Sequence, residues 1–341
     1  MLKKIVLLTI VLVLISWGYQ VFSMQTVEDH AFMMDTFVTI HIPTRNKSQA
    51  AAAMKETFHA MQTLSTQLDR YETSSVSLVS QINQSSGEES VSLPETVINI
   101  FHTAQMISEA SDGAFDLSIG VVVDLWRKSE LTGILPSSSA MSSALSLVDY
   151  KKIYMQDNQV FLEDKNMSLD LGAIAKGAIA DLAKETLQSQ GIERAILDAG
   201  GNIVAIGSKT DQEPWSIGIA NPNQPTEIMG YVEVTDLSVV TAGIYQRAYE
   251  INGERYHHIL STENGYPTSS LKSVTILHPS SLMADALSTA VMVLGPDNGL
   301  SLIESYPGTE AIIISADDAL ILSKGAEAYF TLLQKDLFHE Q

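Results

Sequence analysis

The second half of the chain contains many short strand-like runs with almost no helix between them, and this grouping most constrains the fold. The runs are rich in β-branched and aromatic residues and are bounded by Gly, Pro, Asn or Asp, which is typical of strands. They lie at residues 195–207, 215–220, 230–234, 238–241, 248–251, 255–260 and 274–277. Because strands come in groups instead of alternating strictly with helices, the sequence predicts an α+β fold and not a doubly wound α/β sheet.

The rest of the chain supplies the helices and a few more strands. Apolar residues at helical spacing predict helices at residues 47–68, 94–110 and 170–190. Further strands and hairpins are expected at residues 33–42, 152–162, 167–171 and 311–322. Ser-rich composition indicates a surface loop around a short helical turn over residues 73–90 and a connector over residues 135–145. Residues 325–332 indicate a last helix or strand. A length of 341 residues allows about two domains or one large α+β domain.

Residues 1–24 are interpreted as a targeting segment. Two early lysines precede an apolar run at residues 5–15, which matches a secretory signal, and Val21 and Ser23 could be the small residues before a cleavage site. An uncleaved anchor is the equal alternative, because residues 5–22 nearly reach the roughly 20 apolar residues that span a bilayer. Both alternatives place the body outside the cytoplasmic membrane, so we expect an extracytoplasmic protein, secreted or anchored to the outer face of that membrane.

Charge and cysteine content exclude several classes of protein. The chain has 20 Lys and Arg against 40 Asp and Glu, a net charge of −20, which argues against binding nucleic acid or anionic membrane through a general basic field. It has no Cys, which excludes disulfides, thiolate nucleophiles, zinc–cysteine sites, iron–sulfur clusters and a lipoprotein anchor. A ligand that carries phosphate must therefore be held by a metal, by backbone amides or by a few local cations.

Residues 284–293 are Ala- and Leu-rich without Gly or Pro, and they predict a buried helix. On that helix Asp285, Ser288 and Thr289 lie at positions i, i+3 and i+4, so their oxygens share one face. Oxygen ligands of this kind suit a hard cation such as Mg²⁺. A buried Asp that is merely satisfied by hydroxyls and backbone amides is the alternative, and for this segment alone it is the more common situation.

Three other segments mix small and polar residues. In residues 169–177, Gly and Ala let a ligand approach the backbone, the start of the helix offers free amides for phosphate, and Lys176 could contact phosphate; tight helix packing is the alternative. The spacing is wrong for a P-loop. Phe115, in a turn, could stack on a ring or pack in the core. His257 and His258 would face opposite sides of a strand, one buried and one exposed, and either could be a structural residue or a general base.

The order of these motifs resembles the FAD:protein FMN transferase family, often called ApbE. The resemblance covers about residues 30–330, and its motifs lie at residues 34–37, 70–71, 113–116, 169–177, 198–202, 241–247, 257–259, 265–267 and 284–289. Each motif is weak alone, whereas their shared order over this length is specific. The resemblance implies one large α+β domain over residues 25–341, of the ApbE or T-fold-like type, with mixed and antiparallel sheets and packed helices.

The resemblance also implies an activity and its residues. Family members cleave FAD with Mg²⁺ and attach FMN by a phosphoester bond to Thr or Ser of a target protein, releasing AMP. By motif, the FAD contacts would be Met34, Tyr71, Ala114, Phe115, Asp116, Asp170, Lys176 and Ile259. The metal would take the Ala173 carbonyl and the side chains of Asp285, Ser288 and Thr289. His258 would deprotonate the acceptor hydroxyl, so His258 and Asp285 are the expected catalytic residues.

The sequence departs from the family pattern in three places, of which the last lies near the expected FAD site and bears on the substrate. Asp35 replaces the usual Gly after Met34, Ala242 replaces a Ser, and residues 261–265 differ from the usual Asp-Pro-x-Thr-Gly. One alternative is an Mg²⁺-dependent FAD pyrophosphatase, whose site would look nearly the same. Others are a non-catalytic FAD-binding protein, which would not need the Asp285, Ser288 and Thr289 set, and a structural extracytoplasmic domain, which the number of matching motifs disfavours. If the chain is a transferase, the resemblance implies an acceptor with an Asp-Gly-x-Thr/Ser-Gly-Ala-Thr/Ser type motif, in a membrane-associated electron-transfer system.

Overall fold

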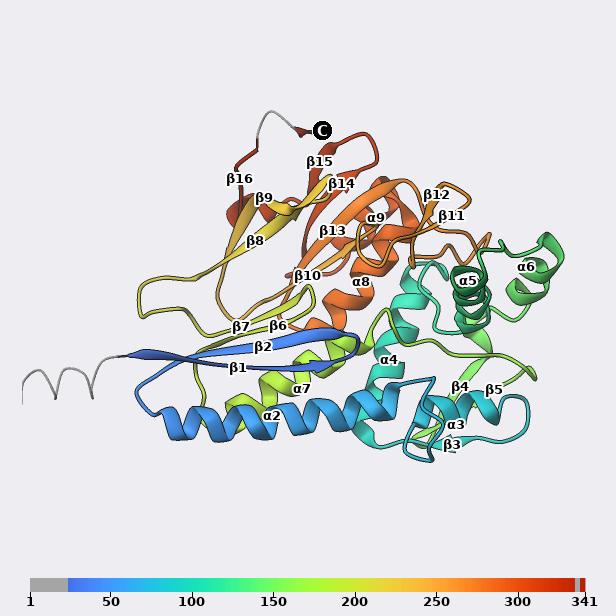
Figure 1. Cartoon of the computed structure of the whole chain (residues 1–341), viewed down its shortest axis with the longest axis horizontal. Coiled ribbons are helices and arrows are strands. Elements are labelled where there is room, and N and C mark those ends of the chain that lie inside the picture. The colour runs from blue at the N-terminus through green and yellow to red at the C-terminus, as the bar shows by residue number, and fades with distance from the viewer. Residues whose placement is uncertain (1–23, 335–337, 341) are drawn as a thin grey trace, which may run out of the picture.

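A nine-stranded sheet forms the centre of the molecule in the computed structural model, which describes residues 24–334 and 338–340 (Figure 1). Its neighbouring strands pair antiparallel, except β15 and β17, which pair parallel. In spatial order the strands are β1 (Gln25–Met33), β2 (Thr36–Thr44), β6 (Ala195–Ala199), β7 (Asn202–Ile206), β10 (Ser238–Gly243), β13 (Leu271–His278), β14 (Glu310–Ser315), β15 (Ala319–Leu322) and β17 (His339–Glu340). The predicted α+β fold is confirmed.

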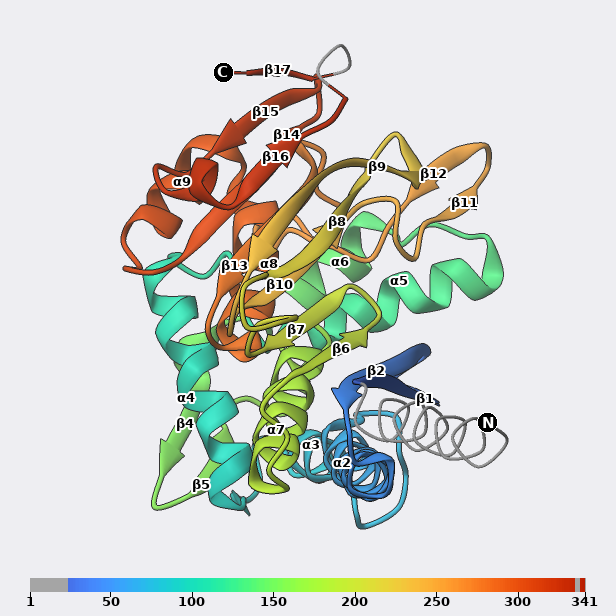
Figure 2. The ribbon, with the colours of Figure 1, turned by 90° about the vertical axis from the view of Figure 1, so that its left-hand side faces the viewer.

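Helices cover one face of this sheet, and Figure 2 shows α2 and α7 packed beside each other under its first strands. The helices are α2 (Lys47–Leu68), α3 (Leu78–Gln84), α4 (Glu95–Ala110), α7 (Ala175–Ser189), α8 (Ser281–Leu294) and α9 (Pro296–Glu304). In α2 the buried side chains recur every three or four residues, from Ala50 through Met54 and Met61 to Leu68, so a single stripe faces the sheet. This layer forms the main hydrophobic core.

A small sheet covers the opposite face. It consists of β16 (Phe330–Leu332), β9 (Gln224–Val234) and β8 (Trp215–Asn221), in that order. Alternate residues of β13 contribute to different cores, because Val274 and Ile276 pack on the helix side while Leu277 packs on the small sheet. Burial on both faces explains why β13 and β14 are almost continuously apolar, where a half-exposed strand would alternate.

A third region closes one end of the molecule. There α5 (Gly120–Thr132) and α6 (Ser138–Leu145) pack near the hairpin of β11 (Tyr249–Ile251) and β12 (Glu254–Tyr256). Trp126 anchors α5, because its indole N–H donates to the Gly265 carbonyl at 2.6 Å. Another small sheet and two short 3₁₀ turns complete the fold: β3 (Val91–Ser92), β5 (Gln159–Leu162), β4 (Ile153–Gln156), Tyr150–Lys152 and Ala326–Ala328.

The strand expected over residues 33–42 is wrong in one respect, because it is a hairpin. Strand β1 ends at Met33 and β2 starts at Thr36, and the two residues between them, Met34 and Asp35, have φ values of 54° and 57°. A two-residue hairpin turn of type I′ needs positive φ at both central positions, which Asn-Gly normally supplies. The sequence lacks that signal, so the turn and the whole of β1 were not predicted.

Several expected boundaries also differ. The Ser-rich connector over 135–145 contains helix α6, whose first amides are capped by Ser137, since its hydroxyl accepts from the Ala140 N–H. The helix expected from residue 170 begins at Ala175, and residues 167–171 form one isolated bridge in place of a strand. Helices α5 and α9 were not predicted.

The targeting segment predicted at the start of the chain has no counterpart in the described structure. The targeting segment lies almost wholly on residues 1–23, which are outside the described residues. Among the residues that are described, no helix has the length and apolar character needed to cross a membrane.

Candidate active site

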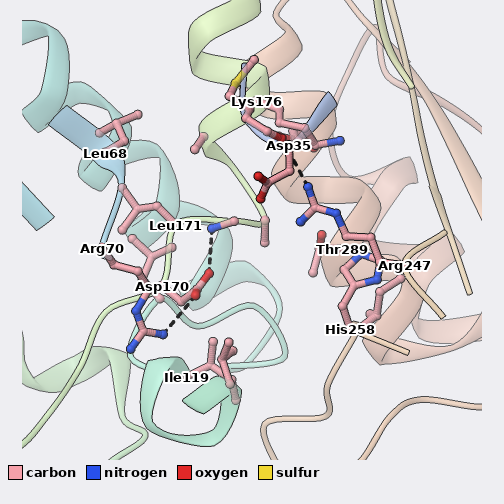
Figure 3. A pocket seen from close by; sticks show the side chains of 18 of the residues that line it. Asp35, Leu68, Arg70, Ile119, Asp170, Leu171, Lys176, Arg247, His258 and Thr289 are labelled. Atoms are coloured by element: carbon pink, nitrogen blue, oxygen red, sulfur yellow. Dashed lines mark hydrogen bonds and ion pairs between the residues drawn. The ribbon is translucent and has the colours of Figure 1, made fainter. Parts of the chain in front are cut away.

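A cavity of about 970 Å³ lies between the β1–β2 hairpin, the C-terminal end of α2, helices α5, α7 and α8, and the loop after β12 (Figure 3). Every residue that the sequence predicted for the site lines it, although these residues come from segments far apart in the chain. They are Met34, Tyr71, Ala114, Phe115, Asp116, Asp170, Ala173, Lys176, His258, Ile259, Asp285, Ser288 and Thr289. Their individual roles stay predictions.

The contact between α7 and α8 places Asp285 in the wall. Asp285 is 5% exposed, and its Oδ2 atom accepts a hydrogen bond from the Gly177 N–H at 2.8 Å. A Cβ on Gly177 would lie 2.3 Å from the Ser281 carbonyl oxygen, so glycine is required for this close approach of the two helices. Burial raises the pKa of Asp285, while the charge of Lys176 and the Gly177 N–H act in the opposite direction. A buried carboxylate of this kind is stabilised by a nearby cation.

The predicted metal ligands are a set of oxygens on adjoining segments. The Ser288 hydroxyl lies one turn after Asp285 and donates to the Asp285 carbonyl at 2.7 Å, and Thr289 and Ala173 line the same cavity. Across residues 24–334 and 338–340, no three His, Asp or Glu side chains converge as a metal cluster. A cation here would therefore draw further ligands from water and substrate, which is how Mg²⁺ is usually held, so the donor set fits Mg²⁺.

Some of the amides at the start of α7, which the sequence predicted to be free for phosphate, already have partners within the protein. The Ala175 N–H donates to the Leu171 carbonyl at 2.8 Å, and the Gly177 N–H is taken by Asp285. The Lys176 side chain, whose ammonium donates to Asn202 Oδ1 at 2.8 Å, is the positive group that this segment presents to the cavity.

The opposite wall is built around a buried arginine that sequence reasoning did not assign. The Arg70 guanidinium pairs with Asp170 at 3.0 Å and with Asp124 at 2.7 Å, and only 8% of its side chain is exposed (Figure 3). Asp170 also accepts the Gly172 N–H at 2.8 Å, which turns the chain toward α7. This pairing fixes the Asp170 carboxylate at the cavity wall.

Two aromatic residues at this wall have different environments. The half-exposed Tyr71 ring has the guanidinium of Arg127 over one face, 3.7 Å from its centroid. Phe115 is 2% exposed and packs in the main core. Tyr71 therefore presents an accessible ring to a ligand, whereas Phe115 shapes the wall from behind. Arg127 has no signal in the sequence because it lies on a helix that was not predicted.

Asp116 braces a loop at the cavity wall. Its Oδ1 accepts from the Ser118 N–H at 2.7 Å and from the Ser118 hydroxyl at 2.6 Å, and its Oδ2 accepts from the Tyr150 N–H at 2.8 Å. Burial raises the pKa of Asp116 to about 6, and these hydrogen bonds limit the rise. The carboxylate thus holds the turn that carries Phe115.

The two adjacent histidines have separate environments, as predicted, although they follow β12 and are not part of it. His257 is buried, with Nε2 2.8 Å from the Thr268 carbonyl and Nδ1 accepting the Ile259 N–H at 3.3 Å. The His258 side chain is exposed to the cavity. Desolvation by the surrounding protein is the main cause that lowers the pKa of His258 to about 4, and the charges of Arg247, His257 and Lys176 act in the same direction. The imidazole is therefore neutral at physiological pH.

The divergent segment after the histidines is held in place by hydrogen bonds. The Thr262 hydroxyl donates to the Gly113 carbonyl at 2.8 Å, and the Gly265 N–H donates to the Ser261 carbonyl at 2.8 Å. The departures over 261–265 therefore still produce an ordered wall, in contact with the turn before Phe115.

The tip of the β1–β2 hairpin is a strained edge of the cavity. Met34, Asp35 and Arg247 all have positive φ, and an Arg247 guanidinium N–H donates to the Met34 carbonyl at 3.4 Å. Thr36 packs closely on Gly200, because a Cβ added to Gly200 would lie 2.4 Å from the hydroxyl oxygen of Thr36. Backbone strain of this kind costs of the order of 1–3 kcal/mol per residue and is typical of ligand sites.

We expect Asp35→Gly to stabilise the folded protein by about 1 kcal/mol, because glycine adopts the φ of 57° without the steric cost that Asp pays. Urea unfolding measures this change. Ser74→Gly, in an exposed loop, is the control for the greater freedom of glycine in the unfolded chain. Equal or lower stability of Asp35→Gly would show that the turn is not strained at this residue.

Comparison with known proteins identifies relatives over most of the chain. The model of the ApbE family matches residues 34–313. A FAD:protein FMN transferase of Treponema pallidum is 32% identical over 298 residues, which cover 82% of each chain, and one of Klebsiella pneumoniae is 33% identical over 261 residues, which cover 75% of this chain and 81% of the relative. The crystal structure of an ApbE protein from Thermotoga maritima has a TM-score of 0.81 at 29% identity, covering 89% of this chain and 99% of that one.

Proposed function

The chain belongs to the ApbE family, and on that premise we propose that it is an Mg²⁺-dependent flavin transferase. It would cleave FAD, attach FMN by a phosphoester bond to a Thr or Ser of a target protein, and release AMP. The observation that carries the proposal is the single cavity in which Asp285, Lys176 and His258 meet. There the oxygen atoms of Asp285, Ser288 and Thr289, which we call the oxygen-rich corner, face the same space as the Lys176 ammonium and the neutral His258 imidazole.

The cavity suits FAD in size and in the distribution of its polar groups. A volume of about 970 Å³ is at the upper end of the usual range for small-molecule sites, as a dinucleotide requires. Tyr71 offers a ring face or edge for stacking, and Lys176 offers a point charge for phosphate. The proposed FAD contacts Met34, Ala114, Asp116, Asp170 and Ile259 would complete the walls around these two anchors.

The chemistry requires charge neutralisation and alignment more than covalent catalysis. Mg²⁺ held by Asp285, Ser288, Thr289 and the Ala173 carbonyl would neutralise charge on the pyrophosphate. Lys176 would hold a phosphate oxygen, and the neutral His258 ring would accept the proton of the acceptor hydroxyl. That oxygen forms a bond to the phosphorus of the FMN half, the bond from this phosphorus to the bridging oxygen breaks, and AMP leaves.

The position of the His258 ring in the cavity suits it to act as a base. A neutral imidazole has one ring nitrogen without a proton, and that nitrogen can accept one. The ring is open to solvent in the cavity, so water could replace the acceptor hydroxyl. For this reason an FAD pyrophosphatase that releases free FMN and AMP is the second candidate function.

The pH dependence of transfer tests this assignment. Because the pKa of His258 is lowered to about 4, the ring stays neutral as pH falls through 6.5 and protonates only further down. With saturating Mg²⁺, we expect kcat/KM to keep most of its value at pH 6 and to fall toward pH 4. A half-maximal point at pH 6.5 or above would contradict the assigned environment of His258.

A direct test of the function uses the purified chain with FAD and Mg²⁺, with and without an acceptor domain that bears the proposed Asp-Gly-x-Thr/Ser-Gly-Ala-Thr/Ser type motif. We expect AMP release that is lost with a chelator and coupled to modification of the acceptor. AMP with free FMN and an unmodified acceptor would favour the pyrophosphatase. Retained FAD without AMP would favour a flavin-binding protein.

Location is part of the proposal and has its own test. We propose that residues 1–24 export the body or anchor it outside the cytoplasmic membrane, where an acceptor in a membrane-associated electron-transfer system would be modified. Fractionation followed by N-terminal sequencing distinguishes the two forms. A mature N-terminus near Met24 indicates cleavage, and an intact N-terminus in the membrane fraction indicates an anchor.

A further inference from the structure

A buried asparagine connects the two charged groups at the oxygen-rich corner. Asn202 is the first residue of β7, directly after the Gly200–Gly201 turn, and it is 0% exposed. Its Oδ1 accepts a hydrogen bond from the Lys176 ammonium at 2.8 Å. A fully buried amide that holds a lysine is a costly arrangement unless both ends of the amide are used.

The other end of the amide is not fully used. Asn202 Nδ2 is buried and makes no hydrogen bond of normal geometry with any residue that the structure describes. The amide is nevertheless near enough to Asp285 to oppose the rise in the pKa of that carboxyl that burial causes. Asn202 thus lies between an ammonium that it holds and a carboxylate that its N–H groups can approach.

This position bears on the competition between Lys176 and a divalent cation for Asp285. The two residues are neighbours across the α7–α8 contact, because the amide that follows Lys176 bonds the Asp285 carboxylate. An ammonium released next to a buried carboxylate would pair with it directly, since each charge is otherwise poorly solvated. Such a pair would occupy the carboxylate and repel a cation.

We propose that Asn202 is a positioning residue that holds the Lys176 ammonium off the Asp285 carboxylate and so keeps that carboxylate available to a divalent cation. The inference rests on the metal site of the proposed function and adds to it a residue that contacts neither substrate nor metal. An amide suits this task because it is neutral, accepts from the ammonium and adds no charge to the corner.

A double-mutant cycle on metal binding tests the proposal, with Mn²⁺ as a paramagnetic substitute for Mg²⁺. The full chain is titrated with Mn²⁺ alone, and free Mn²⁺ is measured by electron paramagnetic resonance. Asn202→Leu, of similar volume, should weaken Mn²⁺ binding at least tenfold, because Lys176 then pairs with Asp285. Adding Lys176→Met to Asn202→Leu should restore binding to within about threefold of Lys176→Met alone.

Two further variants keep the test decisive if Asn202→Leu folds poorly. Asn202→Asp still accepts from Lys176, so Mn²⁺ binding should be at least as tight as in the wild type. Asn221→Leu removes another 0% exposed asparagine, one that bonds Gln334 and lies outside the cavity, and it should leave Mn²⁺ binding unchanged.

Three results would overturn the inference. The first is that Asn202→Leu binds Mn²⁺ as the wild type does. The second is that Asn202→Asp loses binding. The third is that the double variant binds as weakly as Asn202→Leu, which would show that Asn202 is merely structural. Failure of the wild type to bind Mn²⁺, both alone and with FAD present, would remove the metal site itself. Transferase activity would then be judged separately, by AMP release in the presence of chelator.

Discussion

Asp285→Asn is expected to abolish Mg²⁺-dependent release of AMP from FAD, with kcat/KM falling by about a thousandfold. The change removes one negative charge and keeps an oxygen that can accept the Gly177 N–H, so the α7–α8 contact is preserved. Loss of a cation that neutralises the pyrophosphate is worth several kcal/mol, and each 1.36 kcal/mol is about tenfold in rate. AMP release across a range of Mg²⁺ concentrations measures the effect.

The matched control is Asp181→Asn. Asp181 caps the start of α8, accepting from the Ser280 hydroxyl at 2.6 Å and from the Ser281 N–H at 2.7 Å, and it does not line the cavity. The Asp181→Asn variant should unfold more easily, while the dependence of its AMP release on Mg²⁺ stays close to that of the wild type. Metal-dependent turnover by Asp285→Asn at the wild-type rate would remove Asp285 from the site.

His258→Ala is expected to bind FAD normally and to lose transfer by about a hundredfold to ten-thousandfold, the range that general-base catalysis contributes. The imidazole is exposed to the cavity and neutral, so its removal deletes a proton acceptor and leaves the fold intact. FAD binding by flavin fluorescence and transfer under single-turnover conditions separate the two effects.

His257→Ala provides the comparison. His257 is buried and bonds the Thr268 carbonyl and the Ile259 N–H, so its loss should destabilise the loop that carries His258 and lower the melting temperature. His258→Ala should melt near the wild-type temperature. If His258→Ala retains both FAD binding and transfer, the base is another group.

The fold class could be predicted because hydrophobic patterning and the grouping of strands depend on local sequence. The apolar run from Val274 to Leu277 predicts strand β13, and it is almost continuously apolar because both faces of the strand are buried. The hairpin turn at Met34 and Asp35 could not be predicted, since the sequence has no Asn-Gly or Asp-Gly pair there and tertiary contacts, including the Arg247 bond to the Met34 carbonyl, hold two non-glycine residues at positive φ.

The candidate site could be predicted as a set of residues but not as an arrangement. The oxygens of Asp285, Ser288 and Thr289 follow from helical spacing alone. Groups such as Arg127 and Asn202 act through partners on other elements, and no spacing in the sequence reports a contact between distant segments. Tertiary structure also decided which helix amides are already bonded at the start of α7, where the Gly177 N–H bonds Asp285.

The most direct test of the proposed activity is mass spectrometry of an acceptor domain after incubation with the purified chain, FAD and Mg²⁺. The domain carries the proposed motif, and a matched domain has its acceptor Thr or Ser replaced by Ala. We predict a covalent FMN adduct on the first domain, one AMP released per adduct, and neither product with chelator or with Asp285→Asn. An unmodified acceptor, with FAD cleaved to free FMN or left intact, would contradict flavin transfer by this protein.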